Sequence, residues 1–117
     1  MKKIDRPKFG VGRRSTRKNI HGEEFTFLVE DAVGFKVGKL NKKYICLQKI
    51  CHEKPKKRLE YRFAYYMIGV KQGAFNRWVF GQYALMIEPN QLERLLKMAS
   101  KKWPDFAKLL PRFSNED

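Results

Sequence analysis

Negative charge is scarce in this sequence. Its 12 Asp and Glu stand against 26 Lys and Arg, so the 117 residues have a formal net charge of +14. The excess is concentrated in residues 1–22, with a net charge of +7, and in residues 36–58, with a net charge of +8. A field this positive attracts polyanions and speeds their encounter at low salt. The clustering favours nucleic acid as the partner over a ribosome-like or anionic-lipid partner.

Long apolar runs, a secretory signal and paired cysteines are also missing. No run of about 18 uncharged apolar residues occurs, so no membrane-spanning helix is predicted. Residues 1–7 are basic but lack the apolar stretch of a secretory signal. Cys46 and Cys51 fall in one predicted strand at positions that point to opposite faces, so we expect reduced thiols and no disulfide between them. These absences predict a cytoplasmic protein with no membrane partner.

The motifs of several enzyme classes are absent as well. No Asp/Glu-x-Lys triplet occurs, although one common metal-nuclease core uses it to hold Mg²⁺ and to steady the phosphate. The two Cys and two His have no Cys-x-x-Cys spacing, whereas a structural zinc site needs four ligands in spaced pairs. No Ser nucleophile elbow, phosphate loop or dinucleotide fingerprint is present. We therefore expect no catalytic residues, no metal and no cofactor.

Four segments of the chain have the composition of β-strands. They alternate apolar and polar residues or are rich in aromatic and β-branched side chains, which is typical of strands. These segments are residues 24–37, 43–52, 60–68 and 77–87. The last two are joined by a polar loop, which indicates a long β-hairpin. Gly81, in the middle of the last segment, predicts a bulge or a close backbone approach.

A helix is predicted after the last strand. Asn90 and Glu93 form a suitable N-cap pair, and apolar residues recur at helical spacing through residues 90–102. The apolar stripe consists of Leu92, Leu95, Leu96 and Ala99. Pro104 ends or restarts the helix, and residues 105–110 form at most a short second one. The predicted fold is therefore α+β, a four-stranded antiparallel sheet with one main helix on one face.

Residues 1–20 have a different composition. They mix Lys, Arg, Gly and Ser with few large apolar groups, which indicates a flexible basic arm. Such arms lie along phosphates and become ordered on binding. Removing this one is expected to leave the fold intact, since few apolar groups would be lost, and to weaken nucleic-acid binding. The remaining residues, 21–117, are predicted to form a single domain.

Aromatic and basic side chains gather on the predicted hairpin. Bases of single strands stack on aromatic faces, and Lys and Arg around such a platform hold the phosphates. One face of the hairpin must pack under the helix; we assign to it Val79, Tyr83, Leu85 and Ile87. Trp78 and Phe80 are placed on the open face. The predicted nucleic-acid-binding residues are Arg13, Arg14, Arg17, Lys18, Lys56, Lys57, Arg58, Tyr61, Arg62, Phe63, Tyr65, Lys71, Arg77, Trp78 and Phe80.

The order of these elements resembles a known fold. In residues 81–96, Gly-Gln-Tyr-Ala-Leu-Met-Ile-Glu-Pro-Asn-Gln-Leu-Glu-Arg-Leu-Leu, the last strand runs directly into the helix. This arrangement resembles the single-stranded-DNA-binding transcriptional coactivators, which are related in plan to the Whirly proteins. The resemblance covers residues 24–102 and implies a curved antiparallel sheet that binds unpaired DNA and a helix that forms a homodimer. The longer aromatic strands and the segment after Pro104 depart from that pattern.

The sequence predicts a non-enzymatic nucleic-acid-binding protein that prefers single-stranded DNA or RNA. Two alternatives stay open. One is a protein-interaction module or small adaptor of a phage or defence system, in which the aromatic residues form a protein interface. The other is a metal-dependent nuclease, which metal-dependent cleavage would identify. Salt titration separates the first two functions, because a polyanion binder loses affinity steeply as salt rises.

Overall fold

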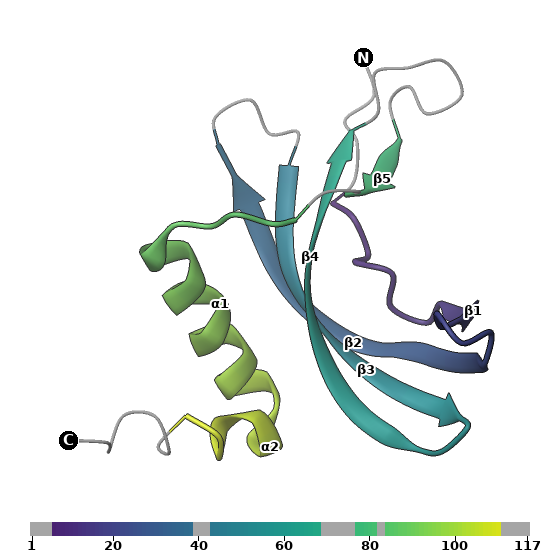
Figure 1. The fold of residues 1–117 in the computed structure, drawn as a ribbon. Coiled ribbons are helices and arrows are strands. Elements are labelled where there is room, and N and C mark those ends of the chain that lie inside the picture. The colour runs from purple at the N-terminus through teal and green to yellow at the C-terminus, as the bar shows by residue number, and fades with distance from the viewer. Residues whose placement is uncertain (1–5, 39–42, 69–76, 82–83, 111–117) are drawn as a thin grey trace. The chain divides into compact units, whose positions relative to one another are not determined.

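The computed structural model describes residues 6–38, 43–68, 77–81 and 84–110. The chain has an α+β fold in which antiparallel strands precede the helices (Figure 1). The strands are β1 (Arg14–Lys18), β2 (Glu24–Val37), β3 (Lys43–Lys54), β4 (Arg58–Ile68) and β5 (Trp78–Phe80), and the helices are α1 (Pro89–Lys102) and α2 (Pro104–Ala107). The chain divides into two compact units, residues 1–85 with the strands and residues 86–117 with the helices.

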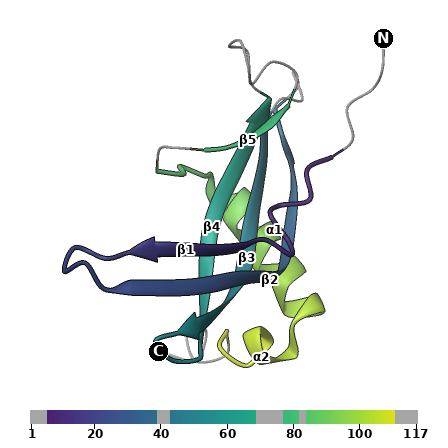
Figure 2. The ribbon, with the colours of Figure 1, turned by 90° about the vertical axis from the view of Figure 1, so that its right-hand side faces the viewer.

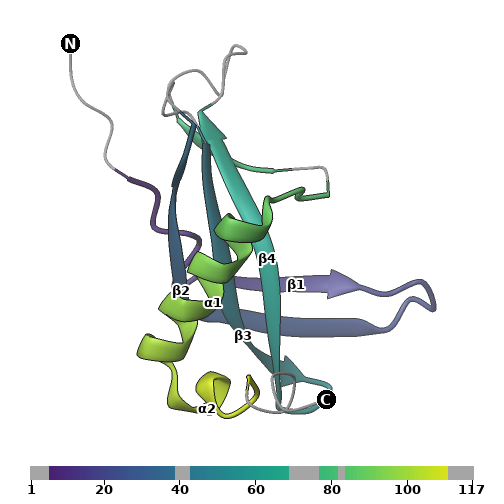
Figure 3. The ribbon, with the colours of Figure 1, turned by 90° about the vertical axis from the view of Figure 1, so that its left-hand side faces the viewer.

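The sheet is a five-stranded meander. Its strand order is β1-β2-β3-β4-β5, and every neighbouring pair is antiparallel. The pairing of β2 with β3 shifts between Thr26 and Phe27 and again between Val29 and Asp31. Such irregularities bend a strand and increase its twist. As a result, β1 and the first half of β2 run crosswise to β4 (Figures 2 and 3), and the sheet curls around a concave face.

The predicted count of four strands is wrong, because the sheet has five. The additional strand, β1, lies in the segment that we expected to be a flexible arm. Four of its five residues are exposed, so it lacks the buried face on which a hydrophobic pattern depends. Backbone pairing holds it instead. Just before the strand, Gly12 N–H donates to Val29 O at 2.8 Å, and Val29 N–H donates to Arg13 O at 3.0 Å.

The other strands follow the predicted segments. β2 has the predicted bounds, and β3 and β4 each extend further toward the turn between them. β5 is shorter than the predicted strand over residues 77–87, since it ends at Phe80 and residues 84–88 are not in a strand. Gly81 N–H donates to Tyr65 O at 2.8 Å, and a Cβ at Gly81 would collide with the Tyr65 ring. The close approach predicted at Gly81 is therefore confirmed.

Phe9, from the predicted arm, is part of the core on the concave face. It is 5% exposed, and its ring centroid lies 6.0 Å from that of Tyr44 and 6.3 Å from that of Tyr66. The buried residues of the same cluster are Ala32, Cys46 and Ala64. Gly34 makes room for this ring, because a Cβ there would lie 2.8 Å from Phe9 Cζ. The prediction of a flexible arm is therefore wrong for residues 6–18, since a single aromatic residue among polar ones gives no periodic pattern.

The helical unit begins earlier than predicted. Glu88 is the N-cap of α1, its N–H donates to Gln91 Oε1 at 2.9 Å, and Pro89 occupies the first turn. Proline suits that position because its missing N–H has no intrahelical acceptor there. The predicted N-cap pair of Asn90 and Glu93 is therefore wrong by two positions.

The apolar stripe of α1 is narrower than predicted. Leu95 and Ala99 are fully buried, Leu96 is half-buried and Leu92 is exposed. The chain restarts at Pro104 as the short helix α2, as the sequence allowed. There the rings of Trp103 and Phe106 meet edge to face with centroids 6.2 Å apart, an arrangement that aromatic pairs prefer.

Candidate functional site

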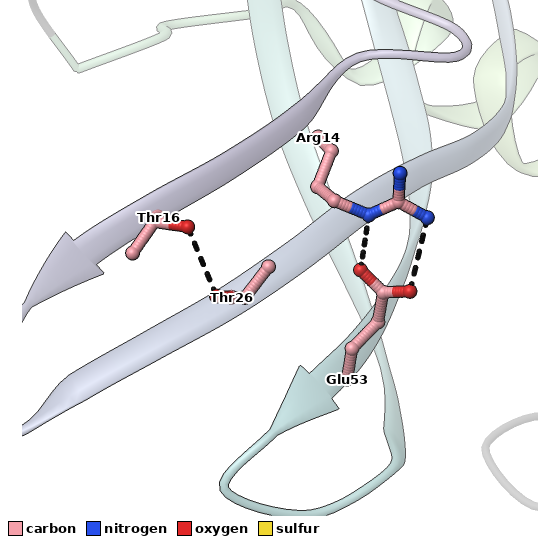
Figure 4. Close-up of polar contacts among 4 residues, drawn as sticks. All are labelled: Arg14, Thr16, Thr26 and Glu53. Carbon is pink, nitrogen blue, oxygen red and sulfur yellow. Dashed lines mark hydrogen bonds and ion pairs between the residues drawn. The ribbon is translucent and has the colours of Figure 1, made fainter.

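The two sides of β1 have different surroundings. On one side, the hydroxyls of Thr16 and Thr26 form a hydrogen bond of 3.0 Å (Figure 4). On the same side, the Arg14 guanidinium donates to both carboxylate oxygens of Glu53, at 2.5 and 3.0 Å. The hydrogen bond from Arg14 lowers the pKa of the Glu53 carboxyl. Because side chains alternate along a strand, Ser15 and Arg17 point the other way, into the concave face. The basic residues of this segment are therefore sorted into two groups.

The concave face contains a cavity of about 160 Å³, called here the first cavity. The described residues that line it are Gly10, Arg13, Ser15, Arg17, Phe27, Val29, Gln48, Arg62, Tyr66 and Phe80. They come from the N-terminal segment and from all five strands, including both edge strands of the sheet. The curl therefore brings the two edges around one space. Three of these side chains are guanidinium groups, and none of the described lining residues is a carboxylate.

Arg62 is the most enclosed of the three arginines. Its Nε donates to Gln48 Oε1 at 2.7 Å, and its Cζ lies 4.9 Å from the ring centroid of Phe80 and 5.5 Å from that of Phe27. Burial lowers the pKa of the Arg62 guanidinium, and the charge of Arg17 acts in the same direction. Within the described part of the chain, Arg62 forms no ion pair with a carboxylate. The result is a half-buried cation between aromatic rings, available to an anion from outside the protein.

Gln48 fixes the floor of the first cavity. It is 0% exposed, and its Nε2 donates to Phe9 O at 2.8 Å and lies 3.4 Å from Tyr66 Oη. Its Oε1 accepts from Arg62, which sets the orientation of the amide because arginine only donates. Burial raises the pKa of the Tyr66 hydroxyl, so the ring stays neutral. The N-terminal segment, β3 and β4 are thus linked around Arg62.

A second cavity of about 380 Å³ adjoins the first, since the two share Arg17, Phe27 and Arg62. The described residues that line it are Arg17, Phe25, Phe27, Ile50, His52, Glu60, Tyr61 and Arg62. The rings of Phe25 and Phe27 lie nearly parallel, at an interplanar angle of 18°, with centroids 6.1 Å apart. His52 is buried, and its Nε2 contacts Glu60 Oε1. The second cavity therefore combines aromatic faces with a polar His–Glu edge.

The structure divides the predicted nucleic-acid-binding residues between several places. Those in the first cavity are Arg13, Arg17, Arg62 and Phe80. Tyr61 lines the second cavity. Phe63 and Tyr65 lie on the face of β4 opposite to that of Tyr66, because successive residues of a strand alternate. The predicted aromatic platform is therefore split between the two faces of the sheet.

The other predicted residues line neither cavity. Arg14 pairs with Glu53, as described above. Trp78 is half-buried, and its ring meets the Tyr44 ring edge-on with centroids 5.2 Å apart. The exposed ones are Lys18, Lys56, Lys57, Arg58 and Arg77. Lys71 lies outside the described residues.

Several cavity residues are absent from the predicted set. They are Gly10, Ser15, Phe25, Phe27, Val29, Gln48, Ile50, His52, Glu60 and Tyr66. Because side chains alternate along a strand, Arg62 and Tyr66 share one face of β4. The pairing of Gln48 with Arg62 and of Ser15 with Phe27 completes the site, and this register between strands is not visible in any one strand.

In the described part of the chain, no three His, Cys, Asp or Glu side chains gather as ligands of a metal would, and no described helix is long and apolar enough to cross a membrane. Comparison with protein-family models, with curated proteins and with solved structures found no match to this chain. Among the described residues, the side chains best placed to hold a ligand are those that line the two cavities.

Proposed function

We propose that this protein binds nucleic acid without catalysing a reaction, and that it prefers single strands, which lie on the concave face of the sheet. The observation that carries the proposal is the first cavity. Three guanidinium groups and two phenylalanine rings line it, and no described lining residue is a carboxylate. A net charge of +14 adds a long-range attraction for polyanions.

The side chains of the site suit the two parts of a nucleotide. A guanidinium donates two parallel hydrogen bonds to phosphate oxygens, which gives both strength and orientation. Aromatic rings stack on nucleobases, which contributes roughly 1–3 kcal/mol per base. Bases in a duplex are already stacked and paired, so they do not reach rings that line a cavity. The preference for single strands follows from this difference.

Three further features belong to the same proposal. The likeness to the single-stranded-DNA-binding coactivators and Whirly proteins agrees with a curved sheet as the binding surface. That likeness also implies a homodimer. A cytoplasmic location, where single-stranded nucleic acid is accessible, completes the proposal.

Fluorescence anisotropy tests the proposal directly. The full chain is titrated into labelled single- and double-stranded DNA and RNA at two salt concentrations. We expect tighter binding of single strands, and a log–log salt slope of about −0.7 for every phosphate that is neutralised. Binding that does not change with salt, or no binding to any of the four ligands, would instead favour the protein-interaction alternative.

A further inference from the structure

The N-terminal segment bounds the first cavity on one side. Gly10 lines the cavity there, and the neighbouring Phe9 O accepts a hydrogen bond from Gln48 Nε2 at 2.8 Å. The Gly10 backbone approaches the Tyr66 hydroxyl so closely that a Cβ on Gly10 would lie 2.8 Å from Tyr66 Oη. Val29 and Gln48, both buried, form part of its wall and floor.

We infer that the first cavity holds a terminal phosphate monoester, so that the protein recognises the phosphorylated end of a strand. The inference rests on the proposed nucleic-acid binding, because it names the part of that ligand which occupies the deepest site. The neighbouring cavity, with Phe25, Phe27 and Tyr61 in its lining, would then hold the terminal nucleoside. Arg17, Phe27 and Arg62 lie in the wall common to both, where the phosphate joins the sugar.

Charge matches a monoester better than a diester. A phosphate monoester carries a charge of about −1.5 to −2 at neutral pH, and it has three strong acceptor oxygens. A diester carries a single negative charge. Arg13, Arg17 and Arg62 bring three positive charges to the first cavity, and the described lining residues bring no negative one. Burial of the Arg62 guanidinium costs desolvation free energy, and a dianion offsets more of that cost than a monoanion does.

The test compares one short oligonucleotide in three forms, with a phosphate at its 5′ end, at its 3′ end or at neither end, and with the dye at an internal position. For the full chain we expect one phosphorylated form to bind at least about tenfold more tightly than the hydroxyl form, since a dianion adds charge-assisted hydrogen bonds. Equal affinity for all three forms would overturn the inference and leave the proposed function standing. No binding to any form would overturn both.

A matched pair of variants locates the effect. Arg17→Gln removes a positive charge from the first cavity, whereas Arg14→Gln removes the same charge from the opposite side of the same strand. We expect the tenfold preference to disappear in Arg17→Gln and to persist in Arg14→Gln. Both arginines are exposed, so the melting temperatures of the two variants should lie close to that of the parent chain, with Arg14→Gln differing only by the small contribution of its ion pair with Glu53. A preference that survives in Arg17→Gln as well as in Arg14→Gln would overturn the assignment to the first cavity.

Competition with a free nucleotide distinguishes two sources of the phosphate monoester, a single nucleotide and the end of a strand. A nucleoside monophosphate and the corresponding nucleoside are added as competitors to the labelled phosphorylated strand. Displacement by the monophosphate but not by the nucleoside would show that a single nucleotide fills the site. If neither displaces the strand while the end preference persists, the strand itself supplies the monoester. Displacement by the nucleoside as effectively as by the monophosphate would overturn the phosphate assignment.

Discussion

Two basic segments of this chain differ in what they contribute to the structure. Residues 6–18 contain six Lys and Arg, and residues 54–58 contain four. The first segment has a buried phenylalanine, pairs with β2 and directs two arginines into a cavity. The second lies at the turn between β3 and β4, and all five of its residues are exposed. Clustered charge alone therefore does not define a cavity, whereas strand pairing decides which charges line one.

The largest expected effect tests whether the N-terminal segment belongs to the core. Phe9→Ala should lower the free energy of unfolding by about 3–5 kcal/mol, because it empties the space among Ala32, Cys46 and Ala64. Ile20 is 95% exposed, so Ile20→Ala is the control and should change stability little. Chemical denaturation of both variants measures the difference. Equal stability of the two would return residues 6–18 to the flexible arm that the sequence suggested.

The second prediction asks what an aromatic ring adds to the basic cavity. Phe80 and Phe63 are matched controls for each other, since they are 41% and 46% exposed and lie on different strands and opposite faces. Phe80→Ala should cost roughly 1–3 kcal/mol of single-strand affinity, the amount that base stacking contributes. Duplex affinity should change less.

Phe63→Ala should leave single-strand affinity nearly unchanged. Anisotropy titrations of both variants, with thermal melting as a check on folding, provide the measurement. A larger loss of affinity in Phe63→Ala than in Phe80→Ala would move the binding surface to the other face of the sheet.

The third prediction compares the two basic segments by salt dependence. Arg17→Gln removes a charge from the first cavity, and Lys56→Gln removes one from the exposed turn. The Arg17 variant should reduce the salt slope of single-strand binding by about 0.7, the contribution of one phosphate contact. The Lys56 variant should change it less, since no described neighbour positions that side chain against a ligand. Equal slopes in the two variants would mean that charge acts here without a defined site.

Much of the fold follows from the pattern of the sequence. Apolar residues alternate along β2, β3 and β4 and recur at helical spacing along α1. Such patterns reveal an element that has one buried face. β1 has no such face, so nothing in its composition distinguishes it from a solvated arm. Phe9 contributes to the core as a single ring, which no periodicity signals. The number of strands and the role of the N-terminal segment therefore could not be predicted from the sequence pattern alone.

The chemistry of the cavity lining was predictable from the sequence, but its arrangement was not. Arg13, Arg17, Arg62 and Phe80 belong to the predicted set and line the first cavity. Gln48 is not in the predicted set. Its role in holding Arg62 depends on the pairing of the two residues across β3 and β4, which the sequence of one strand does not reveal. Composition identifies the side chains that suit a polyanion. Register and curl, which depend on several strands at once, decide which of them meet.

The smallest expected effect concerns Arg14, the arginine of β1 that points away from the cavity. Its hydrogen bonds lower the pKa of Glu53 in the folded chain. A carboxyl whose folded-state pKa is depressed stabilises the fold above its unfolded pKa, and this contribution is lost as the pH falls through the folded-state pKa. Melting temperatures of the parent chain and of Arg14→Gln should therefore differ slightly at about pH 7 and should converge as the pH falls through the lowered folded-state pKa of Glu53.

Arg13→Gln is the control for this last prediction. It removes the same charge from the neighbouring position, and the described residues include no carboxylate that pairs with Arg13. Its melting temperature should therefore keep a constant offset from the parent chain over the same pH range. The Arg14 effect should be small in any case, because both partners are solvated and exposed ion pairs contribute little to stability. An identical pH dependence in the two variants would show that Glu53 responds to the general positive field and not to Arg14, and would remove the distinction between the two sides of β1.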